Sequence, residues 1–353
     1  VMVAGASTVD GLTGEKGLNG YAAGTLGALS RALSLFMRLD DGLLPALLRR
    51  HPKLNQSWRF HVDTWVDERF YPTCGDGGGF AAPHTAYCGI SPCGADPDPL
   101  APSPYPFLMA LHRTTGDPLY VQLIYKLNGH TVDGLPVDFF AADAAAFRRE
   151  VVGVIERVGA DCTVGSVNKQ EWCLALLRSR DPVTRATAWL DYDAGGNHGH
   201  SDAMNLGLYA FGLDLMPDFG YPPVQYGGHD TVKALWYWHP AAHNTVVVDG
   251  RCQTAGYAAI RGRTTLWADT AGLRLIRANA PAAGFGQYTF TGTDHERICF
   301  YFAMPGAIDR VEVFTEPSPG EGWQPVFADD FKRDQLGPDW QVVSGEWRIV
   351  DGV

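Results

Sequence analysis

The residues that could do chemistry are concentrated between Gly195 and Asp249. His198 and His200 are two apart, and side chains two apart on an extended chain point to the same face. Imidazole suits zinc, and a carboxylate with a third histidine would complete a three-ligand site that keeps one position open. The spacing indicates half of a metal site on a strand. A surface histidine pair without a metal is the simpler alternative.

Two further segments could complete such a site. Asp218 and His243 each lie at the edge of a segment whose composition is typical of a strand or turn. We therefore expect His200, Asp218 and His243 to meet around one metal ion, with His198 left beside them for acid–base chemistry. Asp202 could replace Asp218 as the acidic ligand, and the spacing does not decide between the two.

The order and separation of these motifs resemble the signature of the heparinase II/III-like polysaccharide lyases, a superfamily that includes alginate and oligoalginate lyases. The matching segments are Asn197-His198-Gly199-His200-Ser201-Asp202, Asn205-Leu206, Leu215 to Pro222 and His243 to Gly250. The resemblance implies an α+β multidomain protein, with part of an (α/α) toroid followed by an antiparallel β-sandwich and the active site in the cleft between them. It also implies one structural zinc ion on His200, Asp218 and His243, and a substrate-facing His198.

A second motif, near the N-terminus, resembles the catalytic loop of the same family. Asp10-Gly11, Glu15 and Tyr21 are similar to its Asp-Gly…Glu-Gly-x-x-x-Tyr pattern, in which the tyrosine is the catalytic acid and base. Lys16 departs from the pattern, because glycine is usual there, and the spacing from Glu to Tyr is one residue longer. The alternative is that Tyr21 only begins a helix and buries its ring in the core.

Cleavage of a uronic-acid polymer by β-elimination needs a base, an acid and a group that neutralises the carboxylate beside the reacting carbon. The resemblance makes Tyr21 and His198 the catalytic pair, and it makes Glu15 and Asn197 substrate-binding residues. A tyrosine acts as a base only if a nearby cation lowers its pKa from about 10. The family's carboxylate-neutralising residue lies well upstream of the tyrosine, so we expect it to be missing here and this chain alone to be a weak catalyst.

Composition narrows the possible partners. The chain has 353 residues, 46% hydrophobic and 19% charged, as in a globular protein with a substantial core. Its formal net charge of −11 argues against nucleic acid, and it also fits awkwardly with the acidic polysaccharide that the resemblance implies. No run approaches the ~18 apolar residues of a membrane span. The resemblance implies a secreted or periplasmic protein, although no signal peptide is visible. The oligomeric state is not indicated.

Hydrophobic periodicity changes along the chain from a helical to a strand-like pattern near residue 159. Helices are predicted at 21–37, 41–50, 56–70, 106–114, 118–127 and 138–158. Strands are predicted at 172–178, 184–192, 204–209, 245–248, 264–269, 273–278, 298–303 and 311–314. We therefore divide the chain into an N-terminally truncated helical toroid (1–158), an antiparallel sandwich (159–316), and a linker with the start of a module (317–353) that resembles laminin-G or concanavalin-like jelly rolls.

Two other functions remain open from the sequence. A relative that binds carbohydrate without cleaving it would keep the zinc and the cleft. A metal-dependent oxygenase on a cupin-like barrel would also place a His-x-His pair on strands. Cupins carry a glutamate a few residues after the second histidine, whereas only Asp202 is near here, and a helical half precedes the strands.

Overall fold

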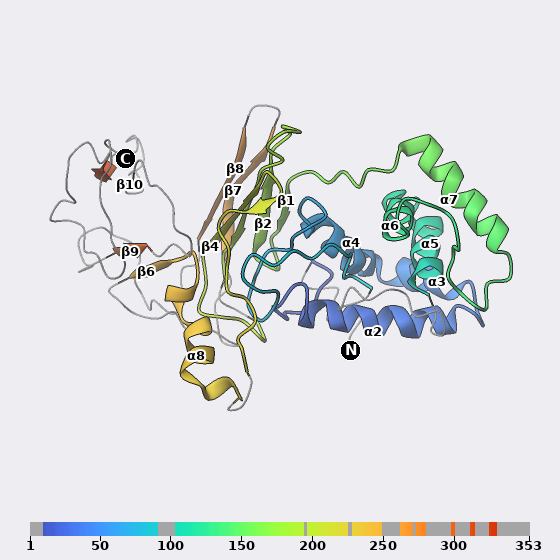
Figure 1. Cartoon of the computed structure of the whole chain (residues 1–353), viewed down its shortest axis with the longest axis horizontal. Coiled ribbons are helices and arrows are strands. Elements are labelled where there is room, and N and C mark those ends of the chain that lie inside the picture. The colour runs from blue at the N-terminus through green and yellow to red at the C-terminus, as the bar shows by residue number, and fades with distance from the viewer. Residues whose placement is uncertain are drawn as a thin grey trace.

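The computed structural model shows a mixed architecture of helices followed by antiparallel strands (Figure 1). It describes residues 10–90, 103–193, 196–224, 228–248, 262–270 and 273–279, and the backbone of three short strands at 298–300, 311–314 and 325–329. The expected turn at 249–250, the end of the predicted strand at 301–303, and the jelly-roll segment other than 325–329 lie outside the described residues. In the described part, no helix is long and apolar enough to cross a membrane.

Helices fill the first half of the chain and lie together on one side of the strands (Figure 1). They are α2 (Tyr21–Phe36), α3 (Leu43–Arg50), the 3-10 turn η1 (Pro52–Leu54), α4 (Asn55–Thr64), α5 (Pro104–Thr115), α6 (Leu119–Leu127) and α7 (Ala144–Val158). Helix α5 packs against α2 and α6, and α6 packs against α7. Their apolar faces form one core, in which Trp58, Phe107 and Leu123 are almost completely buried.

Two helix boundaries differ from the predicted ones, and local chemistry explains both. The helix predicted to run to Phe70 ends at Thr64, because Trp65 is extended and Asp67 has a left-handed backbone, with φ of 51°. The helix predicted from residue 138 begins at Ala144, because the Asp143 side chain accepts a hydrogen bond from a first-turn amide and caps the helix there.

A five-stranded antiparallel sheet follows, with its strands in sequence order. The strands are β1 (Val167–Lys169), β2 (Leu174–Arg178), β3 (Thr187–Asp191), β4 (Asn205–Ala210) and β5 (Leu213–Asp214). The buried face of β4 carries Asn205, Gly207 and Tyr209, whereas Leu206 is 41% exposed. Gly207 is needed there because a Cβ atom would lie 2.0 Å from the Trp189 indole on the paired strand.

The remaining strands form two-stranded pairs. They are β6 (Val246–Val248) with β9 (Ile298–Phe300), β7 (Arg263–Asp269) with β8 (Arg274–Asn279), and β10 (Val311–Phe314) with β11 (Pro325–Asp329). The β7–β8 hairpin packs on β2, with Trp267 and Ile276 against the buried Tyr192. The sheet thus has the helical core on one face and this hairpin over β2 on the other. Strand β11 pairs with β10 across the expected boundary at residue 316.

Between β5 and β6, the chain forms a short helical segment that the periodicity did not predict. It consists of the 3-10 turn η2 (Gly228–Asp230), helix α8 (Val232–Trp238) and the 3-10 turn η3 (Pro240–Ala242). Thr231 caps α8 by accepting a hydrogen bond from Ala234 N. With only seven residues, α8 is too short to give a clear helical period.

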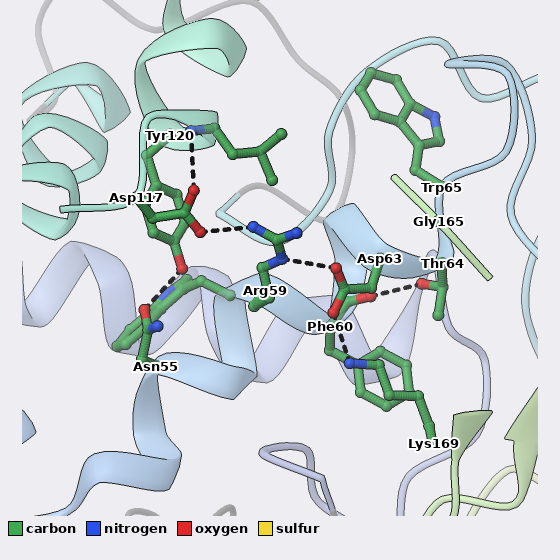
Figure 2. Close-up of polar contacts among 12 residues, drawn as sticks. Asn55, Arg59, Phe60, Asp63, Thr64, Trp65, Asp117, Tyr120, Gly165 and Lys169 are labelled. Carbon is green, nitrogen blue, oxygen red and sulfur yellow. Dashed lines mark hydrogen bonds and ion pairs between the residues drawn. The ribbon is translucent and has the colours of Figure 1, made fainter. Parts of the chain in front are cut away.

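An ionic network joins the helices to the sheet (Figure 2). The Arg59 guanidinium on α4 donates to Asp63 at 2.7 Å and to Asp117 at 2.6 Å. Lys169 on β1 donates to the other carboxylate oxygen of Asp63 at 2.7 Å. Arg178 on β2 donates to the backbone carbonyl of Asp63 at 2.6 Å. Because the same aspartate binds groups from a helix and two strands, it fixes α4 against the sheet edge.

Candidate active site

Three loops that are far apart in the sequence come together beside the sheet: residues 14–17, 74–77 and 196–200. Backbone hydrogen bonds join them. The Lys16 amide donates to the Asn197 carbonyl at 2.8 Å, and the Asp76 amide donates to the His198 carbonyl at 2.8 Å. Gly75 permits this approach, because its φ is +70° and a Cβ atom would lie 2.3 Å from the same His198 carbonyl. The histidine loop is therefore fixed through its backbone.

The loop conformation corrects one expectation about the histidine pair. His198 and His200 do not lie on a strand, and His198 has a left-handed backbone with φ of 55°. As a result, their side chains reach different surroundings. His198 is half-buried beside Glu15, and His200 is completely buried beside Asp76. The sequence analysis assumed an extended chain and could not foresee this separation.

Tyr21, His198 and Glu15 form a compact cluster. The Tyr21 and His198 rings are stacked, with centroids 3.6 Å apart and an interplanar angle of 4°. The Glu15 carboxylate is bonded to His198 Nδ1 and also accepts from Asn197 Nδ2 at 3.2 Å. With Nδ1–H directed at the carboxylate, the neutral imidazole keeps the lone pair on Nε2. Tyr21 is 37% exposed, so its ring is not a core residue.

A hydrogen bond sets the protonation state of Tyr21. Its hydroxyl lies 3.0 Å from the Tyr221 hydroxyl. This bond, with burial as the second cause, raises the pKa of Tyr21 to about 12. The direction is opposite to the lowering that a tyrosine base requires. At neutral pH Tyr21 is therefore protonated and suited to donate a proton.

A second cluster of possible metal ligands is fully buried. His200, Asp202 and His243 each offer a ligand atom, and these atoms all lie within 4.8 Å of one another. Within the described part of the chain, His200 Nδ1, Asp202 Oδ2 and His243 Nε2 are buried without a hydrogen-bond partner. Buried polar atoms are normally paired, so three unpaired atoms that converge fit a metal ion as their common partner.

Two more carboxylates bind the other ring nitrogens of these histidines. Asp76 Oδ1 lies 2.9 Å from His200 Nε2, and Asp218 Oδ2 lies 2.7 Å from His243 Nδ1. Burial alone would lower the pKa of His243, but the charge and the hydrogen bond of Asp218, together with the charge of Asp202, outweigh burial and raise it to about 9. Asp218 also accepts from Asn205 Nδ2 and from the Gly220 amide, each at 2.9 Å. Carboxylates that orient metal-ligating histidines are typical of metal sites.

The structure thus brings the expected residues together and adds others. The half-exposed cluster consists of Tyr21, His198, Glu15 and Asn197. The buried cluster consists of His200, His243 and the two candidate aspartates, Asp202 and Asp218. The sequence assigned no role to Asp76 or Tyr221. The Gly75-Asp76 dipeptide in a long irregular stretch was the available signal for Asp76, and Tyr221 lies within the segment Leu215 to Pro222 that matches the family signature. A cavity of about 1150 Å³ between α2, α3 and α5 contains none of these residues.

Residues 186–312 match a family model described as Heparinase II/III-like, C-terminal. Over these residues the resemblance to the heparinase II/III-like family is confirmed. The match covers less than half of the chain. No curated protein matches.

Two solved structures are among those similar to the chain. One is a heparan sulfate lyase HepC from Pedobacter heparinus, at 12% identity and a TM-score of 0.44, covering 76% of this chain and 34% of that one. The other is a heparinase III gene product with methylated lysines, at 12% identity and a TM-score of 0.41, covering 65% and 28%. The chain therefore spans about a third of the length of these structures or less.

The heparinase II/III-like stretch contains both site histidines of the 196–200 loop, together with His243, Asp202 and Asp218. Tyr21 and Glu15 lie outside it, more than 160 residues upstream of its start at residue 186. The contact between Glu15 and His198 spans 183 residues. Folding therefore brings Tyr21 and Glu15 to His198, which lies inside the matched stretch.

Proposed function

We propose that this protein is a polysaccharide lyase that cleaves an acidic, uronic-acid-containing chain by β-elimination. The observation that supports this best is the stacked pair of Tyr21 and His198, with Glu15 bonded to the imidazole. The pair offers a proton donor and a proton acceptor at one half-exposed place. β-Elimination requires both, on neighbouring carbon and oxygen atoms of the substrate.

The pKa of Tyr21 assigns the two roles. His198 Nε2 removes the proton from the carbon next to the uronate carboxylate, and the resulting imidazolium is stabilised by Glu15. The electron pair forms the new carbon–carbon double bond and expels the glycosidic oxygen. The Tyr21 hydroxyl, with its pKa of about 12, gives its proton to that oxygen. Tyr221 then hydrogen-bonds to the Tyr21 phenolate until solvent returns the proton.

We also propose one structural zinc ion at the buried cluster. His200, His243 and Asp202 would hold it, while Asp76 and Asp218 orient the histidines. This arrangement favours Asp202, the alternative ligand, over Asp218. The ion would supply a fixed positive charge that holds the buried residues together. It would thereby keep the 196–200 loop in place and His198 against Tyr21.

The finer architecture and location belong to the same proposal. The helices of residues 1–158 would form part of an (α/α) toroid, and the strands of 159–316 would form the sandwich against which it closes. Residues 317–353 would be a linker and the beginning of a jelly-roll module. A polymer substrate found outside cells would place the protein in the periplasm or the medium.

The test is to follow the ultraviolet absorbance of the unsaturated uronate product. The chain would be incubated with heparan sulfate, hyaluronan, chondroitin sulfate and alginate, alongside Tyr21→Phe and His198→Ala. We expect absorbance to rise slowly with at least one polymer, because none of the residues assigned here neutralises the uronate carboxylate, and to stop rising with either variant. A rise that survives both substitutions would leave the reaction class but remove these residues from it. Zinc-loaded, folded protein that gives no product with any polymer would instead support a binding protein.

A further inference from the structure

A row of aromatic rings leads away from the reaction centre. The Tyr221 ring centroid lies 6.1 Å from that of Tyr21, and the His229 centroid lies 6.5 Å from that of Tyr221. Beyond them, the His229 and Trp238 rings are stacked with centroids 5.3 Å apart and an interplanar angle of 13°. His229 and Trp238 take no part in the proton transfers described above.

The two outer rings are held by defined structure. His229 lies in η2, and Trp238 is the last residue of α8, whose first turn Thr231 caps. Trp238 Nε1 donates to Asp76 Oδ1 at 3.5 Å, and this oxygen also bonds the imidazole of His200. The row is therefore attached at one end to the Tyr21–His198 pair and at the other to the buried histidines. A surface fixed in this way loses little conformational entropy when it binds a ligand.

The rings are also accessible. His229 is exposed, and Tyr221 and Trp238 are half-buried, so each of the three residues is partly open to solvent. Fixed aromatic rings with polar edges suit a ligand that has apolar C–H faces and a rim of hydroxyl or carboxylate groups. A sugar ring has both. A neutral imidazole donates a hydrogen bond to a carboxylate, and a protonated imidazole also forms an ion pair with the carboxylate.

We propose that Tyr221, His229 and Trp238 form a sugar-binding subsite beside the reaction centre. It holds a sugar unit beyond the two that flank the reacting bond, by stacking against its ring, while the His229 imidazole meets a carboxylate of the chain. The subsite rests on the proposed function, because the ligand is a further unit of the same acidic chain. It would make long substrates bind better than short ones, because a disaccharide bound across the reacting bond does not reach this third unit.

The experiment measures binding by calorimetry to the full chain carrying Tyr21→Phe, so that bound sugars are not cleaved. The probes are disaccharides and hexasaccharides of heparan sulfate, hyaluronan and alginate. His229→Ala is expected to raise the Kd of the bound hexasaccharide about 3- to 10-fold, as for loss of one aromatic contact, and to leave the disaccharide Kd unchanged. His229→Phe keeps the stacking and should recover part of the loss. Leu235→Ala, at an exposed residue of the neighbouring helix α8, is the matched control and should change neither value.

The other outcomes distinguish a failure of the subsite from a failure of the lyase proposal. If His229→Ala binds the hexasaccharide as well as Leu235→Ala does, the subsite is wrong and the lyase proposal stands on its absorbance assay. If His229→Ala weakens disaccharide and hexasaccharide equally, His229 belongs to the reaction centre and the neighbouring subsite is wrong. If the folded starting protein binds none of the probes and the unmodified chain forms no unsaturated product, both proposals fail together.

Discussion

At the residue scale, the candidate site depends on one carboxylate that fixes one imidazole. Glu15 accepts from Asn197 and is bonded to His198, so it determines which ring nitrogen of His198 faces the substrate. The ring stacking with Tyr21 then fixes the tilt of the imidazole. Neither contact is local in the sequence. Both follow from backbone bonding between the 14–17 and 196–200 loops.

Glu15→Gln tests this positioning role. The amide can still accept a hydrogen bond, but it does not stabilise the imidazolium that forms when His198 takes a proton. We expect kcat to fall about 100-fold, at the lower end of what general acid–base catalysis contributes, with KM nearly unchanged. Steady-state kinetics with the absorbance assay measures both constants. A rise in KM at constant kcat would instead make Glu15 a substrate-binding residue only.

Tyr221→Phe tests the proton donor. The Tyr221 hydroxyl is the first cause of the raised pKa of Tyr21, which is about 12. Without it, the pKa of Tyr21 should fall toward 10. The protonated phenol is the active form. When the solution is made alkaline, the Tyr221→Phe variant should therefore lose activity at a lower pH than the unmodified protein does. The pH dependence of kcat shows the shift. An unchanged alkaline limb would mean that Tyr21 is not the acid.

At the element scale, a buried lysine attaches the catalytic loop to the sheet. Lys16 Nζ donates to Asp191 at 3.0 Å and to Asp193 at 2.6 Å, and it lies 4.0 Å from the Trp172 ring centroid. Burial lowers the pKa of this lysine, but the two carboxylates outweigh burial and raise it well above the ordinary value. Lys16, which departs from the family pattern, thus anchors the segment between Glu15 and Tyr21.

Lys16→Met should be strongly destabilising. It leaves Asp191 and Asp193 in a buried place without their cation, and removing one partner of a buried ion pair costs about 3 to 5 kcal/mol. Urea unfolding measures this loss. Lys53→Ala, which removes an ion pair that is half-exposed, is the control and should cost less than about 1 kcal/mol. Equal effects of the two substitutions would show that Lys16 is not an anchor.

His61 on α4 makes the helical core sensitive to acid. Its ring is completely buried and bonds the Leu18 carbonyl at 2.8 Å, and burial lowers its pKa to about 4. The unfolded chain, with a histidine pKa near 6.5, binds the proton more readily, so stability falls as pH drops from about 6.5 toward 4.

Between pH 7.5 and pH 5, this group alone should lower the free energy of unfolding by about 2 kcal/mol. His61→Gln removes the titrating group. The difference in free energy of unfolding between the unmodified protein and this variant should therefore change by about 2 kcal/mol between pH 7.5 and pH 5. Urea unfolding at the two pH values measures it. A difference that stays constant with pH would contradict the low pKa.

The sequence predicted elements better than it predicted the site. Periodicity located most helices and the three central strands of the main sheet, β2 to β4, because their apolar faces follow local rules, whereas the short edge strands β1 and β5 were not predicted. It assigned the His198–His200 segment to a strand, because a left-handed residue at φ of 55° leaves no trace in hydrophobic spacing. Asp76 could not be found by spacing either, because 124 residues separate it from the histidine that it bonds.

At the scale of the whole molecule, the buried cluster lies where the histidine loop, the β4–β5 region and the η3 turn meet. His200 and Asp202 come from one segment before β4, His243 follows η3, and Asp76 reaches the same place from the helical half. A metal ion that binds only the folded chain stabilises the whole of it by mass action.

Removal of the metal should therefore lower the melting temperature of the whole chain. Chelation at neutral pH, followed by calorimetry and return of zinc, measures this change. Asp202→Asn should abolish the response to zinc, whereas Asp218→Asn should weaken zinc affinity about 10- to 100-fold, as expected for a carboxylate that orients a ligand. The reverse order of the two effects would make Asp218 the ligand. A chain that melts identically with and without zinc would contradict the site.

The connection between α7 and β1 has a practical consequence. Helix α7 ends at Val158 and β1 begins at Val167, and the proton donor Tyr21 lies before this connection, whereas its partner His198 lies after it. Two separately expressed polypeptides, divided within residues 159–166, would each carry half of the reaction centre. Turnover would then report their association, and the Asp63 network would supply the contacts that bring the pieces together.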